Sequence, residues 1–358
     1  MAERWRLVDT GLRPAAQNIA LDRALLEARR ADEIPSTLRF ARFPRCALIG
    51  SQQAVEQELD LDYCGSAGIT VQRRVTAGDL MCLDPAQLMW ELVLHRRDVG
   101  SSDLQSIARR INHAAAAGVS ALGVDARYRP RGDIEVDGRS LSVGAGVLDG
   151  TALLYQGALL LDADPAELAR ASRLARGAPG SARDRQASLK DLLGARPEAG
   201  AVRRYLAEAF ESEFDVEFSE GDLTLSENAR FKEALREIDY PDWVQMVSQP
   251  ATALPVLAAR HPVPGGELLA AVAYDPQARI IRHAWFGGDV ALHPRRALVD
   301  LEAALAGTPA NRVAQRVERF FAGSGAGAAP LEPADFVRVV QLAIGRLLPA
   351  GIDEKNAL

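Results

Sequence analysis

Lysine and cysteine are scarce in this chain of 358 residues, and the shortage of cysteine already excludes some classes of protein. The three cysteines, Cys46, Cys64 and Cys82, contain no C-x-x-C pair, so neither a disulfide framework nor a zinc ribbon is expected. A net charge of −6 argues against a nucleic-acid partner. No run approaches the roughly 18 apolar residues of a membrane span. The first residues lack the apolar stretch of a signal peptide. We therefore expect a cytoplasmic protein with no membrane partner.

The basic residues are almost all arginine. Of 42 basic residues only Lys190, Lys232 and Lys355 are lysine, so no lysine precedes Lys190. Residues 1–189 therefore supply no side-chain ammonium group. Arginine does not replace it, because the planar guanidinium group does not reproduce a point charge.

Strand and helix patterns follow one another irregularly along the chain. Strands are expected at 38–43, 47–50, 69–75, 88–94, 133–136, 141 onward, 151–162, 267–274 and 280–286. Helices are expected at 19–31 (with Asn18 as its cap), 104–122, 164–174, 188–194, 198–211, 294–306, 309–321 and 331–348. Loops are expected at 76–86, 175–186 and 322–329. This irregular order favours an α+β fold over a doubly wound parallel sheet.

Proline and glycine gather near 245–265, and the composition changes there. We therefore place a domain boundary at this cluster, with one domain over 1–245 and a smaller one over 246–358.

Two adjacent arginines end the expected strand at 69–75. Arg73 and Arg74 enter a glycine-containing turn just before Thr76. Two guanidinium groups beside exposed backbone N–H groups suit a phosphate or a carboxylate. Paired arginines at a strand end are also often solvated or ion-paired, so both interpretations stay open.

Small residues mark two further positions where a ligand could approach the backbone. Asp137-Gly138 predicts a hairpin turn between the strands 133–136 and 141 onward. Gly144 and Gly146 lie in the strand that follows this turn, and Gln156 precedes Gly157 inside an apolar strand. Without side chains these glycines would let a ligand lie against the main chain. A tight packing contact is the alternative explanation.

Taken in order, these segments resemble the lipoate–protein ligase family, within the biotin/lipoate ligase fold. The residues that carry the resemblance are Trp5–Gly11, Asn18–Asp22, Leu38–Phe40, Ile49–Gln53, Arg73–Thr76, Gly132–Ile134, Gly138-Arg139 and Tyr155–Gly157. The later part, with Gly265-Gly266, Trp285–Asp289 and Leu301–Gly307, looks like the family's accessory domain. The resemblance implies a mixed, largely antiparallel sheet with flanking helices, followed by a small α+β accessory domain.

The family activates lipoate with ATP to lipoyl-adenylate and transfers the acyl group to a lysine of a lipoyl carrier domain. The resemblance therefore implies ATP (with Mg²⁺), lipoate or octanoate as substrates, and a lipoyl carrier domain as partner. Arg74, or Arg73 beside it, matches the adenylate-contacting arginine, and Asp133 matches the acidic position of the hairpin. The family's glycine loop corresponds to Thr76, Ala77, Gly78 and Asp79.

Two departures from the family pattern fall in that loop. Ala77 and Asp79 stand where the family has glycine. If those positions need positive φ or backbone contact with the ligand, each side chain costs free energy. A carboxylate at Asp79 also repels a phosphate.

The gravest departure is Ser140, which follows Arg139 where the family has lysine. That lysine bridges the acyl carboxylate and the phosphate. Removing one transition-state donor costs about 2.7–4 kcal/mol. Arg139 is a poor substitute, and Lys190 is a remote one, which requires its helix to fold over the site.

Three functions follow. The first is an ATP-dependent lipoate–protein ligase, impaired by the change at Ser140. The second is a catalytically inactive paralogue that binds a lipoyl carrier domain, an acyl chain or a partner ligase subunit. The third is a lipoyl or octanoyl transferase with Cys82 as nucleophile, although a lone cysteine is more often a buried small hydrophobe. The five histidines show no ligand spacing, so no metal site is expected.

Overall fold

A computed structural model describes residues 3–101, 103–129, 133–162, 164, 169–173, 185–246, 254–264, 266–288, 296–324 and 331–345. The chain divides into two compact units, Met1–Ser248 and Gln249–Leu358. The sequence places the boundary after residue 245, and the catalytic and accessory roles assigned to the two parts remain predictions.

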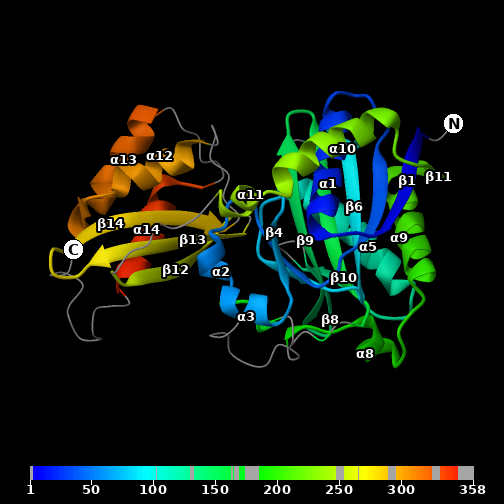
Figure 1. Cartoon of the computed structure of the whole chain (residues 1–358), viewed down its shortest axis with the longest axis horizontal. Coiled ribbons are helices and arrows are strands. Elements are labelled where there is room, and N and C mark those ends of the chain that lie inside the picture. Colours follow the sequence, from blue (N-terminus) through cyan, green and yellow to red (C-terminus); the bar gives the residue numbers. More distant parts are fainter. Residues whose placement is uncertain are drawn as a thin grey trace. The chain divides into compact units, whose positions relative to one another are not determined.

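An eight-stranded sheet forms the centre of the first unit (Figure 1), in the order β11-β1-β2-β6-β10-β9-β8-β7. β1 runs parallel to both of its neighbours, and the other pairs are antiparallel. The predicted α+β fold with a mixed, largely antiparallel sheet is confirmed. The strands are β1 (Glu3–Leu12), β2 (Thr37–Arg42), β6 (Gln87–His95), β7 (Arg127–Arg129), β8 (Asp133–Val136), β9 (Arg139–Asp149), β10 (Ala152–Leu160) and β11 (Val216–Glu220).

A second, three-stranded sheet belongs to the same unit. It has the order β4-β3-β5, with β4 (Thr70–Arg73), β3 (Cys46–Ile49) and β5 (Met81–Leu83). The predicted loop at 76–86 is therefore wrong in its centre, because β5 pairs with β3 there. Two short helices, α2 (Val55–Glu58) and α3 (Leu61–Ser66), connect β3 to β4.

Helices cover both faces of the large sheet. On one face α5 (Leu104–Ser120) and α9 (Ala199–Phe214) enclose a core that includes Trp90 and Phe210. On the other face α1 (Ala15–Arg30) packs against α10 (Leu225–Ile238), and its Ile19 shares a core with Ala145 and Met89. The shorter helices are α4 (Arg96–Val99), α8 (Leu189–Leu193) and α11 (Pro241–Gln245).

Helix α1 begins earlier than the sequence predicts. Its N-cap is Pro14, so Asn18 is not the cap but a fully buried residue of the first turns. The side-chain amide of Asn18 donates to the carbonyl of Arg42 at 2.9 Å. The asparagine therefore connects α1 to the end of β2. From the sequence alone, an asparagine in this role looks the same as a helix cap.

The second unit is a four-stranded antiparallel sheet with helices against it. Its strands are β12 (Val256–Val263), β13 (Gly266–Asp275), β14 (Ile280–Gly288) and β15 (Thr308–Pro309), and its helices are α12 (Arg296–Leu305), α13 (Val313–Ser324) and α14 (Pro333–Gly345), with a 3-10 turn at Ala310–Arg312. Leu301, Val317 and Phe336 meet in its core. The predicted helix at 164–174 is wrong at its end, because residues 170–173 form turns and Ser172 forms a bridge to Leu59; residues 165–168 and 174 lie outside the described residues. Most of the predicted loops at 175–186 and 322–329 also lies outside the described residues, although α13 continues to Ser324.

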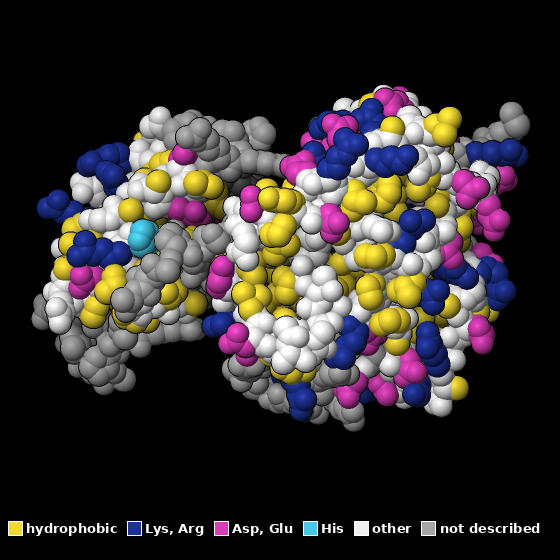
Figure 2. Space-filling view, viewed as in Figure 1, with side chains coloured by type: hydrophobic (Ala, Val, Ile, Leu, Met, Phe, Trp, Pro, Cys, Tyr) yellow, Lys and Arg dark blue, Asp and Glu magenta, His cyan; other side chains and the backbone are white. Residues whose placement is uncertain are grey.

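The surface carries charges of both signs. Figure 2 shows basic and acidic side chains interspersed on the visible face of the first unit, with hydrophobic side chains between them. In the part of the chain that the structure describes, none of the helices is long and apolar enough to cross a bilayer.

Candidate functional site

Arg74 lies directly behind the loop that the sequence singles out. Its side chain is completely buried. One terminal nitrogen donates to the carbonyls of Ala77 and Asp79, at 3.0 and 2.9 Å, and the other donates to the carbonyl of Leu48 at 2.8 Å. Its Nε donates to the hydroxyl of Thr76 at 3.1 Å. The guanidinium group therefore shapes the loop over 76–79, which we call the ligand loop.

Arg73 donates hydrogen bonds to a different part of the main chain. Its guanidinium donates to the carbonyls of Gly50 and Gln53, at 2.9 and 2.7 Å, and to that of Val244 at 2.7 Å. The indole N–H of Trp243 donates back to the carbonyl of Arg73 at 3.0 Å. Burial lowers the pKa of Arg73 to about 10, and that of Arg74 likewise, so both stay charged at neutral pH. Their predicted role in binding an adenylate stays a prediction.

The ligand loop needs a glycine at one position. Gly78 has φ +95°, a conformation that residues with side chains rarely adopt. Its carbonyl oxygen lies 2.2 Å from where a Cβ on Gly50 would stand, so the two glycines allow the loop to touch the end of β3. Ala77 and Asp79 do not have positive φ, so the backbone cost considered for them is not incurred. The Asp79 side chain is exposed at the surface of the loop.

Packing explains two glycines of β9 and β10. A Cβ on Gly146 would lie 2.7 Å from the ring of Tyr155, and one on Gly157 would lie 2.3 Å from the ring of Trp90. Gly144 lies opposite Gly157 in the sheet. The aromatic rings fill the space at Gly146 and Gly157, which favours the packing alternative there, whereas the ligand contact expected at Gly144 stays a prediction.

Ser140 faces the side of the sheet on which α1 and the ligand loop lie. It pairs with Glu135, whereas Ile134 and Val136 on either side of Glu135 point into the core under α5. Paired residues of antiparallel strands share a face. Asp133, two residues before Glu135, is half-buried and lies on the same face as Ser140. The hydroxyl of Ser140 donates to the carbonyl of Ser142 at 3.3 Å.

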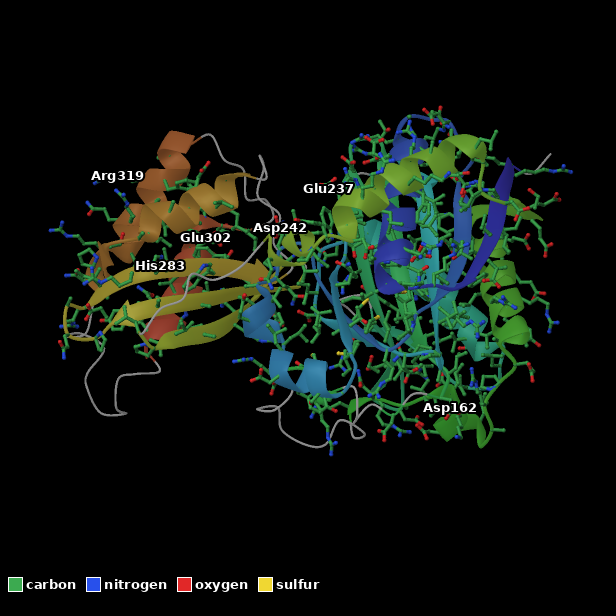
Figure 3. The ribbon with its side chains drawn as sticks, viewed as in Figure 1. Asp162, Glu237, Asp242, His283, Glu302 and Arg319 are labelled. Carbon is green, nitrogen blue, oxygen red and sulfur yellow. The ribbon has the colours of Figure 1, made fainter. Side chains whose placement is uncertain are left out.

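Neither substitute for the missing lysine is placed to act. Arg139 pairs with Val136, so it occupies the opposite face from Ser140. The segment before α8 does reach this strand, since the N–H of Ala187 donates to the carbonyl of Ser140 at 3.0 Å. Lys190 lies on α8, however, and its half-exposed amine forms an ion pair with Asp162 at 2.8 Å. Figure 3 labels Asp162 beside this helix.

Cys82 lies on β5, opposite Ala47. Burial raises the pKa of its thiol to about 12. A cysteine nucleophile acts as the thiolate, which needs a lowered pKa. The environment of Cys82 therefore keeps the thiol protonated and does not activate it.

A network of buried charges lies beneath the ligand loop. Arg39 on β2 bridges Asp22 on α1 and Glu91 on β6, the latter at 2.7 Å, and all three side chains are inaccessible to solvent. The amide nitrogen of Gln156 lies 3.5 Å from Asp22 and 3.4 Å from Glu91. Burial raises the pKa of Asp22, and it raises that of Glu91 to about 8. Burial therefore favours a protonated carboxyl beside Arg39 at neutral pH.

Sequence reasoning did not identify this network. Asp22 and Arg39 lie within segments that carry the family resemblance, but neither they nor Glu91 has a predicted role. The available signal was a polar residue inside an apolar run, because Glu91 interrupts the buried strand 88–94. Among the residues that the structure describes, no group of three or more His, Cys, Asp or Glu side chains could hold a metal ion.

Comparisons with known proteins agree on the first unit. A model of the lipoyl protein ligase A/B catalytic domain matches residues 14–211, just over half of the chain. The octanoyltransferase LipM of Moorella thermoacetica is 28% identical over 274 residues, which are 68% of this chain and 98% of that protein. Lipoate-protein ligase A subunit 1 of Thermoplasma acidophilum is 28% identical over 236 residues, which are 60% of this chain and 86% of that protein.

Solved structures give the same result. A lipoate-protein ligase A bound with ATP superposes with a TM-score of 0.61 at 26% identity, over 69% of this chain and all of that chain. A lipoate protein ligase of T. acidophilum with bound lipoic acid has a TM-score of 0.58 at 26% identity, over 68% of this chain and all of that chain.

Proposed function

This chain belongs to the lipoyl protein ligase A/B catalytic-domain family, and on that premise we propose that it works in protein lipoylation or octanoylation by binding an acyl group and a lipoyl carrier domain without forming an acyl-adenylate itself. The family resemblance drawn from the sequence is confirmed. One observation carries the proposal. The cations assigned to the adenylate are all engaged elsewhere, and Ser140 has a hydroxyl where an amine is needed.

Adenylation places a carboxylate against a triphosphate, so the site must supply positive charge where the phosphorane forms. The guanidinium groups of Arg73 and Arg74 donate their hydrogen bonds to main-chain carbonyls. Lys190 is paired with Asp162, and the exposed carboxylate of Asp79 adds negative charge to the ligand loop. Among the described residues predicted to meet the adenylate, these contacts leave no cation to neutralise the phosphorane, so we derive no reaction step through ATP or the Mg²⁺ expected with it.

The same surroundings suit an acyl chain better than a phosphate. Val75 and Val143 are half-buried beside the loop and pack against a core that includes Ala145. Apolar side chains of this kind gain free energy when a hydrocarbon chain covers them, at about 25 cal/mol per Å². Lipoate and octanoate both offer such a chain, so the proposal covers either acyl group.

An ATP-dependent ligase is the second candidate. The likeness to a lipoate-protein ligase A bound with ATP favours it. In that case a partner ligase subunit supplies the amine that Ser140 lacks. The octanoyltransferases among the relatives favour acyl transfer without ATP, but the protonated thiol of Cys82 does not support this residue as the nucleophile.

The proposal is tested by mixing the full chain with an apo-lipoyl domain, lipoic acid and ATP. We expect the domain to be retained by the immobilised chain while its intact mass stays unchanged. A lipoyl domain whose acceptor lysine is replaced by alanine is the control for transfer. A mass increase that depends on the acceptor lysine would overturn the absence of adenylation, and failure to retain either apo- or lipoylated domain would overturn the carrier-binding role.

A further inference from the structure

Gln156 lies in the middle of β10 with both ends of its amide engaged. Its oxygen accepts the hydroxyl hydrogen of Thr76 at 2.6 Å. Its nitrogen faces Asp22 and Glu91, at 3.5 and 3.4 Å. Those carboxyls also accept from Arg39, and the NH₂ group of the amide is turned toward them, with its oxygen toward Thr76.

That orientation dictates the hydrogen bonds of the loop. Thr76 has one hydroxyl hydrogen, which it gives to Gln156, so its oxygen is left to accept from the Nε of Arg74 at 3.1 Å. The same guanidinium holds the carbonyls of Ala77 and Asp79. A continuous chain of donors and acceptors therefore runs from the buried carboxyls to the ligand loop.

We infer that Gln156 is a positioning residue, which fixes the ligand loop through Thr76 and Arg74 instead of contacting the ligand. Its side chain is fully buried, and both polar atoms already have partners within the protein. The sequence predicts a ligand contact at this residue, and the inference replaces that role. It rests on the proposed function only in taking the loop as the part that meets the acyl group.

The charges around Gln156 explain why an amide is required. Asp22 and Glu91 face it from α1 and β6, and Arg39 on β2 is the cation between them. A carboxylate at position 156 would add a third acidic group beside Asp22 and Glu91, with Arg39 and Arg74 as the cations, and it would lack the N–H donors that the two carboxyls accept. Gln156→Glu is therefore expected to disturb the loop more than Gln156→Met, although glutamate has the same shape as glutamine.

Hydrogen exchange of the unliganded full chain measures the loop directly. The amide of Ser51 donates to the carbonyl of Thr76 at 2.9 Å, so its exchange reports whether the loop is seated. In Gln156→Met we expect this amide to exchange about tenfold faster, as for loss of one buried hydrogen bond. The amide of Arg74, bonded to the carbonyl of Ile49, is the internal reference and should not change.

Thr76→Val removes the same link while keeping the shape of the side chain, so the test holds even if Gln156→Met does not fold. The two substitutions should each accelerate Ser51, and together should have no greater effect than either alone. Thr10→Val is the matched control, because it also loses two hydrogen bonds, from Arg39 and to the carbonyl of Phe40, on the far side of the network. That variant should leave the ratio of Ser51 to Arg74 exchange unchanged.

An unchanged Ser51 amide in both variants, or fully additive effects, would overturn the inference. Binding of lipoic acid provides the functional readout, with an affinity about tenfold weaker in Gln156→Met and unaltered in Thr10→Val. A wild-type chain that binds no lipoic acid would count against the proposed function alone, since the exchange result still decides the role of Gln156.

Discussion

The hydroxyl of Thr76 donates a hydrogen bond of 2.6 Å to the side-chain oxygen of Gln156, eighty residues later in the chain. This bond joins the ligand loop to the centre of the large sheet. The loop thus takes its shape from buried groups of the protein, and the arginine next to it is held by the main chain before any ligand arrives.

Gly50→Ala should displace the ligand loop. A Cβ at this position would stand 2.2 Å from the carbonyl oxygen of Gly78. Overpacking of this kind costs about 1–3 kcal/mol, which urea unfolding would measure as a lower free energy of unfolding. Gly65→Ala on α3 is the control, because nothing lies within 4 Å of its Cβ position. Equal effects of the two substitutions would contradict this account of the loop.

Glu91 should make the protein less stable as pH rises. Burial raises its pKa from an ordinary value of 4.5 to about 8. Between these values the folded protein holds a proton that the unfolded chain releases, so the free energy of unfolding falls with increasing pH, at up to about 1.4 kcal/mol per pH unit. The contribution is complete below pH 4.5 and is lost as pH passes through 8.

Glu91→Gln should flatten this dependence, as denaturant unfolding at a series of pH values between 4.5 and 8 would show. Glu217→Gln on the exposed side of β11 is the control and should keep the slope of the wild-type chain. An identical slope in wild type and Glu91→Gln would show that Glu91 does not hold the proton.

Cys82 should resist thiol reagents in the folded protein. Burial raises the pKa of its thiol to about 12, so almost no thiolate exists at neutral pH. We expect iodoacetamide to leave Cys82 unmodified until the chain is unfolded, with peptide mass spectrometry as the measurement. Rapid modification of native Cys82, together with loss of any acyl transfer in Cys82→Ala, would restore it as a candidate nucleophile.

Asp79 should weaken the binding of anions at the ligand loop. Its carboxylate is exposed, so the repulsion is modest and screened by salt. Asp79→Gly is expected to increase the affinity for ATP about two- to fivefold at low ionic strength, measured by calorimetry, with the gain fading in high salt. Asp62→Asn on α3 is the control and should produce no gain. A gain of the same size in both would assign the effect to net charge alone.

The sequence predicted the family and the larger elements because long periodic segments and linear motifs carry them. The helix at 104–122 and the strand at 88–94 match α5 and β6 closely. The three-residue strand β5 was missed, since its pairing with β3 comes from tertiary contact and not from local propensity.

The site was predicted less completely, for a physical reason. Residue types showed that Arg73 and Arg74 lie beside the loop, but not that their donors are taken by carbonyls distant in sequence, such as that of Val244. Likewise, the order of the motifs predicted that Gln156 lies near the ligand, but it could not show that the amide nitrogen of Gln156 faces Asp22 and Glu91.

Exchange of labelled pyrophosphate into ATP, dependent on lipoate, tests the central claim most directly, because it detects the adenylate without a carrier domain. The account predicts that the wild-type chain shows no exchange above a heat-denatured sample. It predicts that Ser140→Lys raises the exchange rate by about a hundredfold or more over that background, by returning an amine to the face of the ligand loop. Lipoate-dependent exchange by the wild-type chain would contradict it.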